Sequence, residues 1–184
     1  MYRRPHSIRT TAAFLSLLAL GTLAARPARA DDASGTVTVN PIDLVNGYVN
    51  FEIDTAIASA LSFHAGLNFL VWDGVWEEHS GDAFAIAPEL GLRLYPFLSA
   101  PAGLWIGPFV GVAYVSVDNG NDSASTAGVY AGGEIGFTLI LFDFLAGSVG
   151  AGLGYQDLSA VVDGARIGPH GVLPRFRLGL GFAF

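Results

Sequence analysis

Four side chains in two neighbouring segments are of the types that carry out nucleophilic hydrolysis. Glu52 and Asp54 stand two residues apart in one segment, and Ser62 and His64 stand two apart in the next. If the chain turns near Ala58, both pairs fall on one face, with Glu52 opposite His64 and Asp54 opposite Ser62. Nucleophilic catalysis also needs an oriented base and a site for the oxyanion, and the sequence indicates neither. A non-catalytic role is therefore the stronger interpretation.

Charged side chains at alternate positions recur along the chain and point to an internal ion-pair network. Alternate residues of a strand share a face, and these side chains alternate with apolar residues that would lie on the opposite face. Charges inside a narrow barrel are costly unless they are paired. All but Asp54 and His64 are expected to form ion pairs. The predicted polar network of the lumen consists of Glu52, Asp54, His64, Glu89, Arg93, Glu134, Arg175 and Arg177.

The last eleven residues show which kind of element holds such side chains. From Pro174 to Phe184, large apolar residues occupy every second position, and arginine, glycine or alanine occupies the positions between them. Residues of so little size suit a crowded interior better than a surface that faces water. The pattern predicts a membrane strand with its apolar side toward lipid and its small and charged side toward the lumen. The apolar side consists of Phe176, Leu178, Leu180, Phe182 and Phe184.

The composition favours a membrane protein that crosses with strands. Hydrophobic residues make up 52% of the chain, and 24 residues are glycine, a poor helix former that permits close approach of backbones. After residue 30, no uninterrupted apolar run is long enough for a spanning helix, which leaves a barrel. Cysteine is absent, so disulfides and thiolate metal sites are excluded.

Residues 1–30 have the pattern of a cleaved secretory signal peptide. Arg3, Arg4 and Arg9 form a basic start, an apolar run follows over 12–25, and Ala28-Arg29-Ala30 supplies a small-residue cleavage site. The alternative is a membrane anchor, but the run is shorter than the roughly 20 residues that a spanning helix needs. The sequence therefore predicts a signal peptide at 1–30 and one barrel domain at 31–184.

The predicted mature chain is strongly acidic. Residues 31–184 hold all sixteen acids but only four of the nine arginines, and there is no lysine, so the net charge is 4 − 16 = −12. Such a surface argues against nucleic acid and anionic lipid headgroups as passive partners. It would suit divalent cations that bridge to lipopolysaccharide.

The lengths of the connections indicate how many strands there are. Strands are predicted at 36–40, 45–54, 61–72, 84–95, 103–117, 129–141, 145–155 and 174–184. Long polar connections near 73–83, 118–126 and 157–173 alternate with short ones at 55–60, 96–102 and 142–144, as in a barrel with long outer loops and short periplasmic turns. Asp163-Gly164 could form a hairpin tip in the longest connection. The fold class is therefore an all-β, eight-stranded antiparallel up-and-down transmembrane barrel.

Three features of these strands are less regular. Pro88 and Pro108 each remove a donor from the ladder, which demands a bulge or a break. Both sets of alternate residues in 103–117 are apolar, so the pattern does not decide which set faces the lumen. Aromatic residues near the strand ends are expected to form interfacial girdles. These are Trp72, Trp76, Tyr95, Phe97, Tyr114, Phe142, Phe144, Tyr155 and Phe184.

The whole pattern resembles the small bacterial outer-membrane barrels of the OmpA-transmembrane, OmpX and OmpW type. The features that carry the resemblance are the signal peptide, the eight alternating segments and the terminal Leu178-x-Leu180-x-Phe182-x-Phe184. The resemblance implies that the chain resides in the Gram-negative outer membrane and is folded by the barrel-assembly machinery, which would read its C-terminal signal. It implies functions as varied as anchoring, adhesion and narrow channels.

We therefore expect a non-enzymatic barrel of structural or surface-interaction type, without cofactors, in contact with outer-membrane lipid and lipopolysaccharide and with no nucleic-acid partner. The sequence does not identify an extracellular partner. Alternatives are a narrow pore, if inward glycines at 107, 111, 132, 136, 150, 152 and 154 leave a water path, and a lipid-modifying enzyme. A soluble lipocalin-like barrel would instead place the apolar face inside.

Candidate metal sites in the sequence are weak. Three histidines of the mature chain, His64, His79 and His170, are too scattered for a zinc site. Two loop clusters could bind a cation, but solvated loops are the simpler interpretation. They are Glu77-Glu78-His79 with Asp82, and Asp118, Asn119, Asn121 and Asp122.

Overall fold

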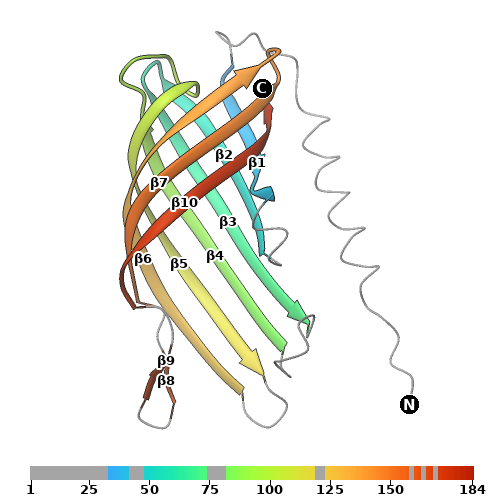
Figure 1. Cartoon of the computed structure of the whole chain (residues 1–184), viewed down its shortest axis with the longest axis vertical. Coiled ribbons are helices and arrows are strands. Elements are labelled where there is room, and N and C mark those ends of the chain that lie inside the picture. Colours follow the sequence, from blue (N-terminus) through green and yellow to red (C-terminus); the bar gives the residue numbers. More distant parts are fainter. Residues whose placement is uncertain are drawn as a thin grey trace, which may run out of the picture.

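The computed structural model describes residues 33–41, 48–73, 82–118, 123–157, 160–162, 165–167 and 170–184. They form a closed antiparallel barrel whose strands follow the order β1-β10-β7-β6-β5-β4-β3-β2, with each strand beside its neighbour in an up-and-down path (Figure 1). The predicted all-β, eight-stranded barrel is confirmed. Its strands are β1 Gly35–Val39, β2 Tyr48–Ala58, β3 Leu61–Asp73, β4 Asp82–Leu94, β5 Gly103–Asp118, β6 Ser123–Leu141, β7 Leu145–Asp157 and β10 His170–Ala183.

The barrel closes between its first and last strands. Register pairs run from Thr36↔Ala183 to Val39↔Leu180, and the backbone N–H groups of Ser34 and Gly35 both donate to the carbonyl of Phe184. The short run that we predicted as a first strand is therefore the element that joins the two ends of the sheet. It is only five residues long, so on the β10 side it pairs only with the last part of that strand.

The short connections lie at one end of the barrel, called here the turn end. They are residues 59–60, 95–102 and 142–144. In the last of them, Phe142 and Asp143 have φ of 54° and 64°, and the N–H of Phe144 donates to the carbonyl of Leu141. Positive φ at both central residues is the type I′ turn that matches strand twist in a hairpin. The opposite end is called the open end.

A small hairpin of β8 Ala160–Val162 and β9 Ala165–Ile167 lies within the longest connection, at the open end (Figure 1). The predicted hairpin tip at 163–164 lies outside the described residues. So do the predicted signal peptide at 1–30, the start of the second predicted strand at 45–47 and most of the two candidate cation loops. Among the described residues, no helix has the length and apolar character needed to cross a membrane.

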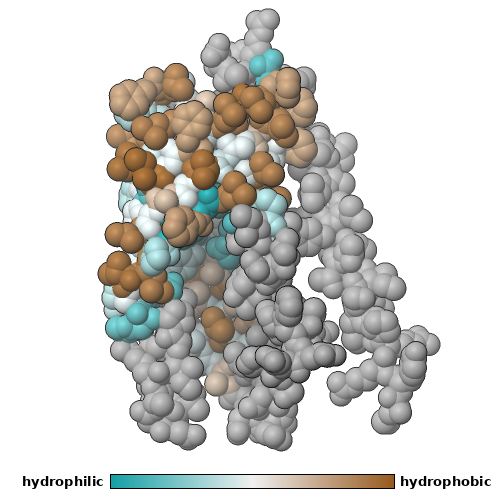
Figure 2. Space-filling model, viewed as in Figure 1, coloured by the Kyte–Doolittle hydropathy of each residue, from teal (hydrophilic) through white to brown (hydrophobic). Residues whose placement is uncertain are grey.

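Alternate residues face opposite sides of the wall. Charged residues of the predicted network are buried inside, whereas large apolar residues such as Leu90 (51% exposed) and Leu153 (61%) stand on the outer surface. Figure 2 shows hydrophobic side chains over the described part of the outer wall. The sequence did not decide which residues of β5 face the lumen. In the structure, Trp105 and Phe109 are buried inside while Ile106 is exposed.

One predicted interfacial aromatic lies elsewhere. Tyr95 is 1% exposed and packs inside the barrel with Trp105 and Ala100, so it is not part of an outer girdle. The reason is parity, because Tyr95 follows Arg93 by two residues and therefore shares its inward direction. Phe97, Phe142 and Phe144 are exposed at the turn end, and Tyr114 and Tyr155 are exposed farther toward the open end.

Both prolines interrupt the same seam of the barrel. The ladder between β4 and β5 runs to Ile86↔Tyr114 and resumes at Glu89↔Gly111, and it breaks again between Gly91↔Phe109 and Leu94↔Ile106. The two gaps fall where Pro88 and Pro108 lack the N–H that a ladder bond needs. The register is the same on both sides of each gap, so these are breaks and not bulges.

Glycines let the two backbones approach closely along this interrupted seam. A Cβ on Gly107 would overlap the carbonyl of Leu92, and a Cβ on Gly111 would come within 2.6 Å of the carbonyl of Pro88. A side chain at either position would therefore force the two backbones apart.

We predict that Gly107→Ala destabilises the barrel by about 1–3 kcal/mol through this overlap. Gly133→Ala is the matched control, because a Cβ there meets only the carbonyl of Gly107 at 3.9 Å. The measurement is the urea midpoint of unfolding for each refolded variant. Equal midpoints for the two alanine variants would show that the seam has room for a methyl group.

Candidate functional site

The eight residues of the predicted network lie on five strands and converge inside the barrel. Glu52 and Asp54 come from β2, His64 from β3, Glu89 and Arg93 from β4, Glu134 from β6, and Arg175 and Arg177 from β10. Seven are at most 6% exposed, and the side chain of Arg175 is 24% exposed. We call these eight residues the charge cluster.

Arg177 stands at the centre of the charge cluster. Its Nε lies 3.0 Å from Oε2 of Glu134, one terminal nitrogen lies 2.8 Å from Oε1 of Glu89, and the other contacts Glu52. These acids belong to three different strands, β6, β4 and β2, so one guanidinium from β10 connects four strands across the lumen. Its side chain is 3% exposed, which means that the protein replaces water as its hydrogen-bonding partner.

The other two arginines extend the cluster in opposite directions along the axis. Toward the open end, Arg175 lies 2.5 Å from Oε2 of Glu89 and 2.6 Å from Oε1 of Glu134. Toward the turn end, Arg93 lies 2.5 Å from Oδ2 of Asp54 and 3.5 Å from Glu52. The hydroxyl of Tyr95 also donates to Asp54, at 3.3 Å.

The cluster is close to neutral. Three arginines face four carboxylates, so its formal charge is 3 − 4 = −1 with His64 neutral. His64 places Nε2 at 3.3 Å from Oε1 of Glu89. Because buried ion pairs gain little net stability against their desolvation, we interpret the cluster mainly as a device that fills the lumen and fixes how the strands align.

Glycines of β7 allow β10 to reach β6. In the register, Arg175 and Glu134 both stand opposite Gly152, one on each neighbouring strand. A Cβ on Gly152 would come within 2.7 Å of Cγ of Glu134. Without a side chain between them, the guanidinium and the carboxylate meet over the bare backbone of β7.

Aromatic rings cover both sides of the charge cluster. The guanidinium of Arg93 lies 4.1 Å from the ring centroid of Trp105, and that of Arg175 lies 4.4 Å from that of Phe109, within cation–π range. The inward glycines receive these rings. Trp105 occupies the space over Gly136 and Gly150, Phe109 covers Gly132 and Gly154, and Tyr130 covers Gly111.

The register of the β2–β3 hairpin differs from the expected one. His64 stands opposite Asp54, Glu52 opposite Gly66, and Ser62 opposite Ala56. The predicted register, with Glu52 opposite His64 and Asp54 opposite Ser62, is therefore wrong by two residues. The turn is formed by residues 59–60, and the register shifts between Ala56 and Ala58. An even shift leaves every side chain on its predicted face.

The serine and the histidine do not form a hydrolytic arrangement. Ser62 Oγ, His64 Nδ1 and Asp54 Oδ1 are buried and have no hydrogen-bond partner within the described chain, whereas Nε2 of His64 contacts Glu89. Ser62 is 0% exposed and His64 is 2% exposed, so a substrate has no access to either. No group of three or more potential metal ligands in the described part of the chain could hold an ion.

The five residues of the predicted C-terminal signal lie on β10 and at its end. Phe176 (80% exposed) and Leu180 (51%) are on the outer surface, while Ala183, on the opposite parity, is fully buried. Phe182 stacks on Phe144 of the β6–β7 turn, with ring centroids 6.4 Å apart. The apolar side of this strand is therefore turned away from the lumen.

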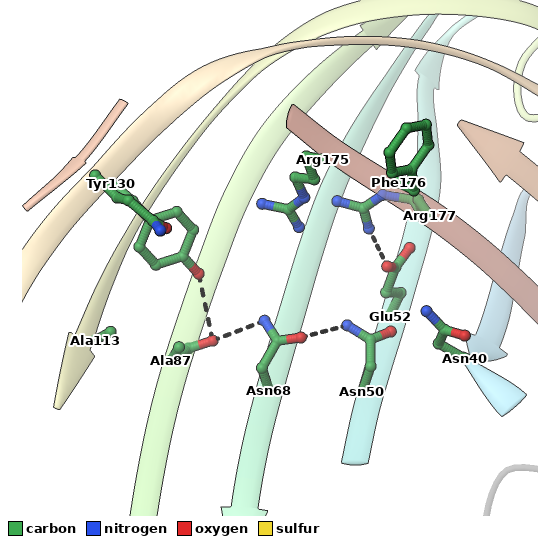
Figure 3. Close-up of a pocket in the computed structure, with 11 residues that line it drawn as sticks. Asn40, Asn50, Glu52, Asn68, Ala87, Ala113, Tyr130, Arg175, Phe176 and Arg177 are labelled. Atoms are coloured by element: carbon green, nitrogen blue, oxygen red, sulfur yellow. Dashed lines mark hydrogen bonds and ion pairs between the residues drawn. The ribbon is translucent and has the colours of Figure 1, made fainter. Parts of the chain in front are cut away.

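Sequence reasoning missed a set of polar residues between the charge cluster and the open end. Asn50 donates to Oδ1 of Asn68 at 2.5 Å, Asn68 donates to the carbonyl of Ala87 at 3.1 Å, and the hydroxyl of Tyr130 donates to the same carbonyl at 3.5 Å (Figure 3). These side chains line a cavity of about 320 Å³. Their shared inward parity was visible in the sequence, but no charge marked them as a site.

We predict that Arg177→Met destabilises the barrel by about 3–5 kcal/mol, because three buried carboxylates lose a partner. Leu178→Met is the control, since that side chain follows Arg177 on the outward parity. The measurement is again the urea midpoint. Adding Glu134→Gln to Arg177→Met should recover part of the lost stability. If the two substitutions instead lower the stability additively, Arg177 and Glu134 are not directly coupled.

Comparison with protein-family models, with curated proteins and with solved structures finds no match for this chain.

Proposed function

We propose that this protein is an integral outer-membrane barrel of structural or surface-interaction type, without enzymatic activity and with a lumen filled by side chains. It would be exported through a cleaved signal peptide at 1–30, inserted by the barrel-assembly machinery and surrounded by outer-membrane lipid and lipopolysaccharide. The observation that carries the proposal is the inverted polarity of the wall, with buried ions inside and exposed apolar side chains outside.

The distribution of polarity supports a lipid environment. Val149 (56% exposed), Leu153 (61%) and Ile135 (51%) stand on the outer wall, whereas Glu89 (1%) and Arg177 (4%) lie inside. A soluble barrel would lose hydrophobic stabilisation by exposing the first group to water and would desolvate the second without need. In a bilayer, lipid solvates the apolar wall, and the lumen is where paired ions avoid the hydrocarbon.

The strand lengths support the same environment. β3, β4 and β7 each contain 13 residues, and β5 and β6 are longer. A tilted strand needs about 9–11 residues to cross the hydrocarbon core. With β2 at 11 residues and β10 at 14, all barrel strands other than β1 are long enough to span. The exposed aromatic residues at the turn end, such as Phe97 and Phe142, would lie at one interface.

An arginine on the outer wall distinguishes lipid from water. Val149→Arg should cost about 2–4 kcal/mol if the site faces the middle of a bilayer, whereas Phe142→Arg, in an exposed turn, should cost about 0–1 kcal/mol. The measurement is folding into lipid vesicles, followed by the shift in gel migration on heating. If the natural chain and Val149→Arg both fold fully in aqueous buffer without lipid, the membrane assignment fails.

Conductance tests whether the lumen is closed. The charge cluster and the rings of Trp105 and Phe109 occupy the space that inward glycines leave, so the protein should give no single-channel steps in planar bilayers. Steady, selective steps from the purified protein would instead favour the narrow pore.

A further inference from the structure

The open-end half of the barrel has a cavity that the proposed structural role does not use, and it reaches the edge of β10, where the exposed Phe176 is one of its lining residues. Its volume of about 320 Å³ is at the lower end of the range for small-molecule sites, about 300–1,000 Å³. Four of its lining residues are carboxamides, namely Asn40, Asn50, Asn68 and Gln156. These four amides stand beside apolar lining residues such as Ala87, Ala113 and Phe176, so the cavity offers hydrogen-bonding groups next to apolar surface.

Two of the carboxamides are held in fixed orientations. Asn50 donates to Asn68, and Asn68 donates to the carbonyl of Ala87 (Figure 3). These bonds use one N–H of each amide, although each amide has two N–H groups and an oxygen that can accept twice. The wall therefore offers both donors and acceptors in a preorganised array, which is what a group of hydroxyls requires.

Arg175 adds further donors at the floor of the cavity. Of the five N–H donors of a guanidinium, its contacts with Glu89 and Glu134 use three, which leaves 5 − 3 = 2. Its side chain is 24% exposed, unlike that of Arg177, which is 3% exposed. Since its charge is already balanced by two carboxylates, the remaining donors suit a neutral oxygen-rich ligand.

Packed side chains lie below this wall. Tyr130 packs against Phe109, with ring centroids 6.3 Å apart, and its hydroxyl donates to the carbonyl of Pro88 at 3.3 Å. Arg177 and Glu52 close the remaining part of the floor through their ion pair. A ligand that enters from the open end would therefore stay in the cavity and would not pass through the barrel.

We propose that this cavity binds a single six-membered polyhydroxylated ring, as in a neutral monosaccharide. The hydroxyls would exchange hydrogen bonds with the carboxamides and accept from Arg175. Such a ring occurs both as a free sugar and as part of a glycolipid headgroup. The site depends on the described lining residues and not on membrane residence, so it can fail independently of the proposed function.

Calorimetric titration of the folded, full-length mature chain in detergent micelles tests the site with matched probes. Glucose and myo-inositol should bind saturably, whereas cyclohexanol, which has the same ring size and one hydroxyl, should not. Binding of cyclohexanol as tightly as myo-inositol would overturn the proposal, because the cavity would then select size and not hydroxyls. Absence of saturable binding by either polyol would overturn it as well.

Variants locate the binding in this cavity. Asn50→Leu and Asn68→Leu should each weaken polyol binding about tenfold or more, equivalent to about 1.4 kcal/mol. Tyr130→Phe, which keeps the ring and removes the hydroxyl, provides a third variant if either leucine variant does not fold. The control is Thr138→Val, which removes hydrogen bonds to Trp105 and Ser148 on the turn-end side of the cluster. Equal affinities in all folded variants would place the polyol elsewhere and overturn the proposal.

A competition experiment distinguishes the two sources of the ring. Lipopolysaccharide that displaces glucose from the natural chain, but binds Asn68→Leu less tightly, would identify a glycolipid headgroup as the ligand. Glucose binding that lipopolysaccharide does not affect would identify a free sugar. Both results support the cavity. If Asn68→Leu changes the affinity for neither glucose nor lipopolysaccharide, both bind elsewhere and the proposal is overturned.

Discussion

The narrow interior of an eight-stranded barrel is the constraint on which the rest of this structure depends. Such a lumen is only just wide enough for side chains, so each inward position must hold either a residue of almost no size or one that finds a partner across the axis. β7 shows the first solution, because its inward glycines leave room for Arg175 to reach Glu134. Arg177 shows the second, with acids of three other strands around one guanidinium.

This constraint also explains the order of layers along the axis. The charge cluster lies between Trp105 and Phe109, whose rings lie against guanidinium groups and rest on glycines of neighbouring strands. Removing water strengthens each ion pair but makes each unpaired charge costly. Rings on both sides keep water out, and four carboxylates close to three arginines and one histidine leave little charge uncompensated. Packing and electrostatics therefore depend on each other at this point.

The sequence predicted faces better than contacts. Alternation assigned Glu52, Glu89 and Arg177 to the inside from local pattern alone, since parity is a property of each strand by itself. The register of the first hairpin was wrong because it depends on which residues form the turn, and nothing in 55–60 marks residues 59–60 over Ala58. The contact of Arg177 with Glu52, 125 residues apart, depends on closure by β1 and on the stagger of every strand, which no local pattern encodes.

The same reasoning separates the two halves of the lumen. In the half nearest the turn end, the ring of Trp105 occupies the space over Gly136 and Gly150, and the backbones approach closely at Gly107. Opening a path there would require repacking several strands and not the movement of one side chain. In the half toward the open end, carboxamides and Arg175 line a cavity beside the packed side chains of the charge cluster. A barrel with one half sealed by its backbone and the other lined for hydrogen bonding is suited to hold a ligand at its mouth, and poorly suited to let one pass.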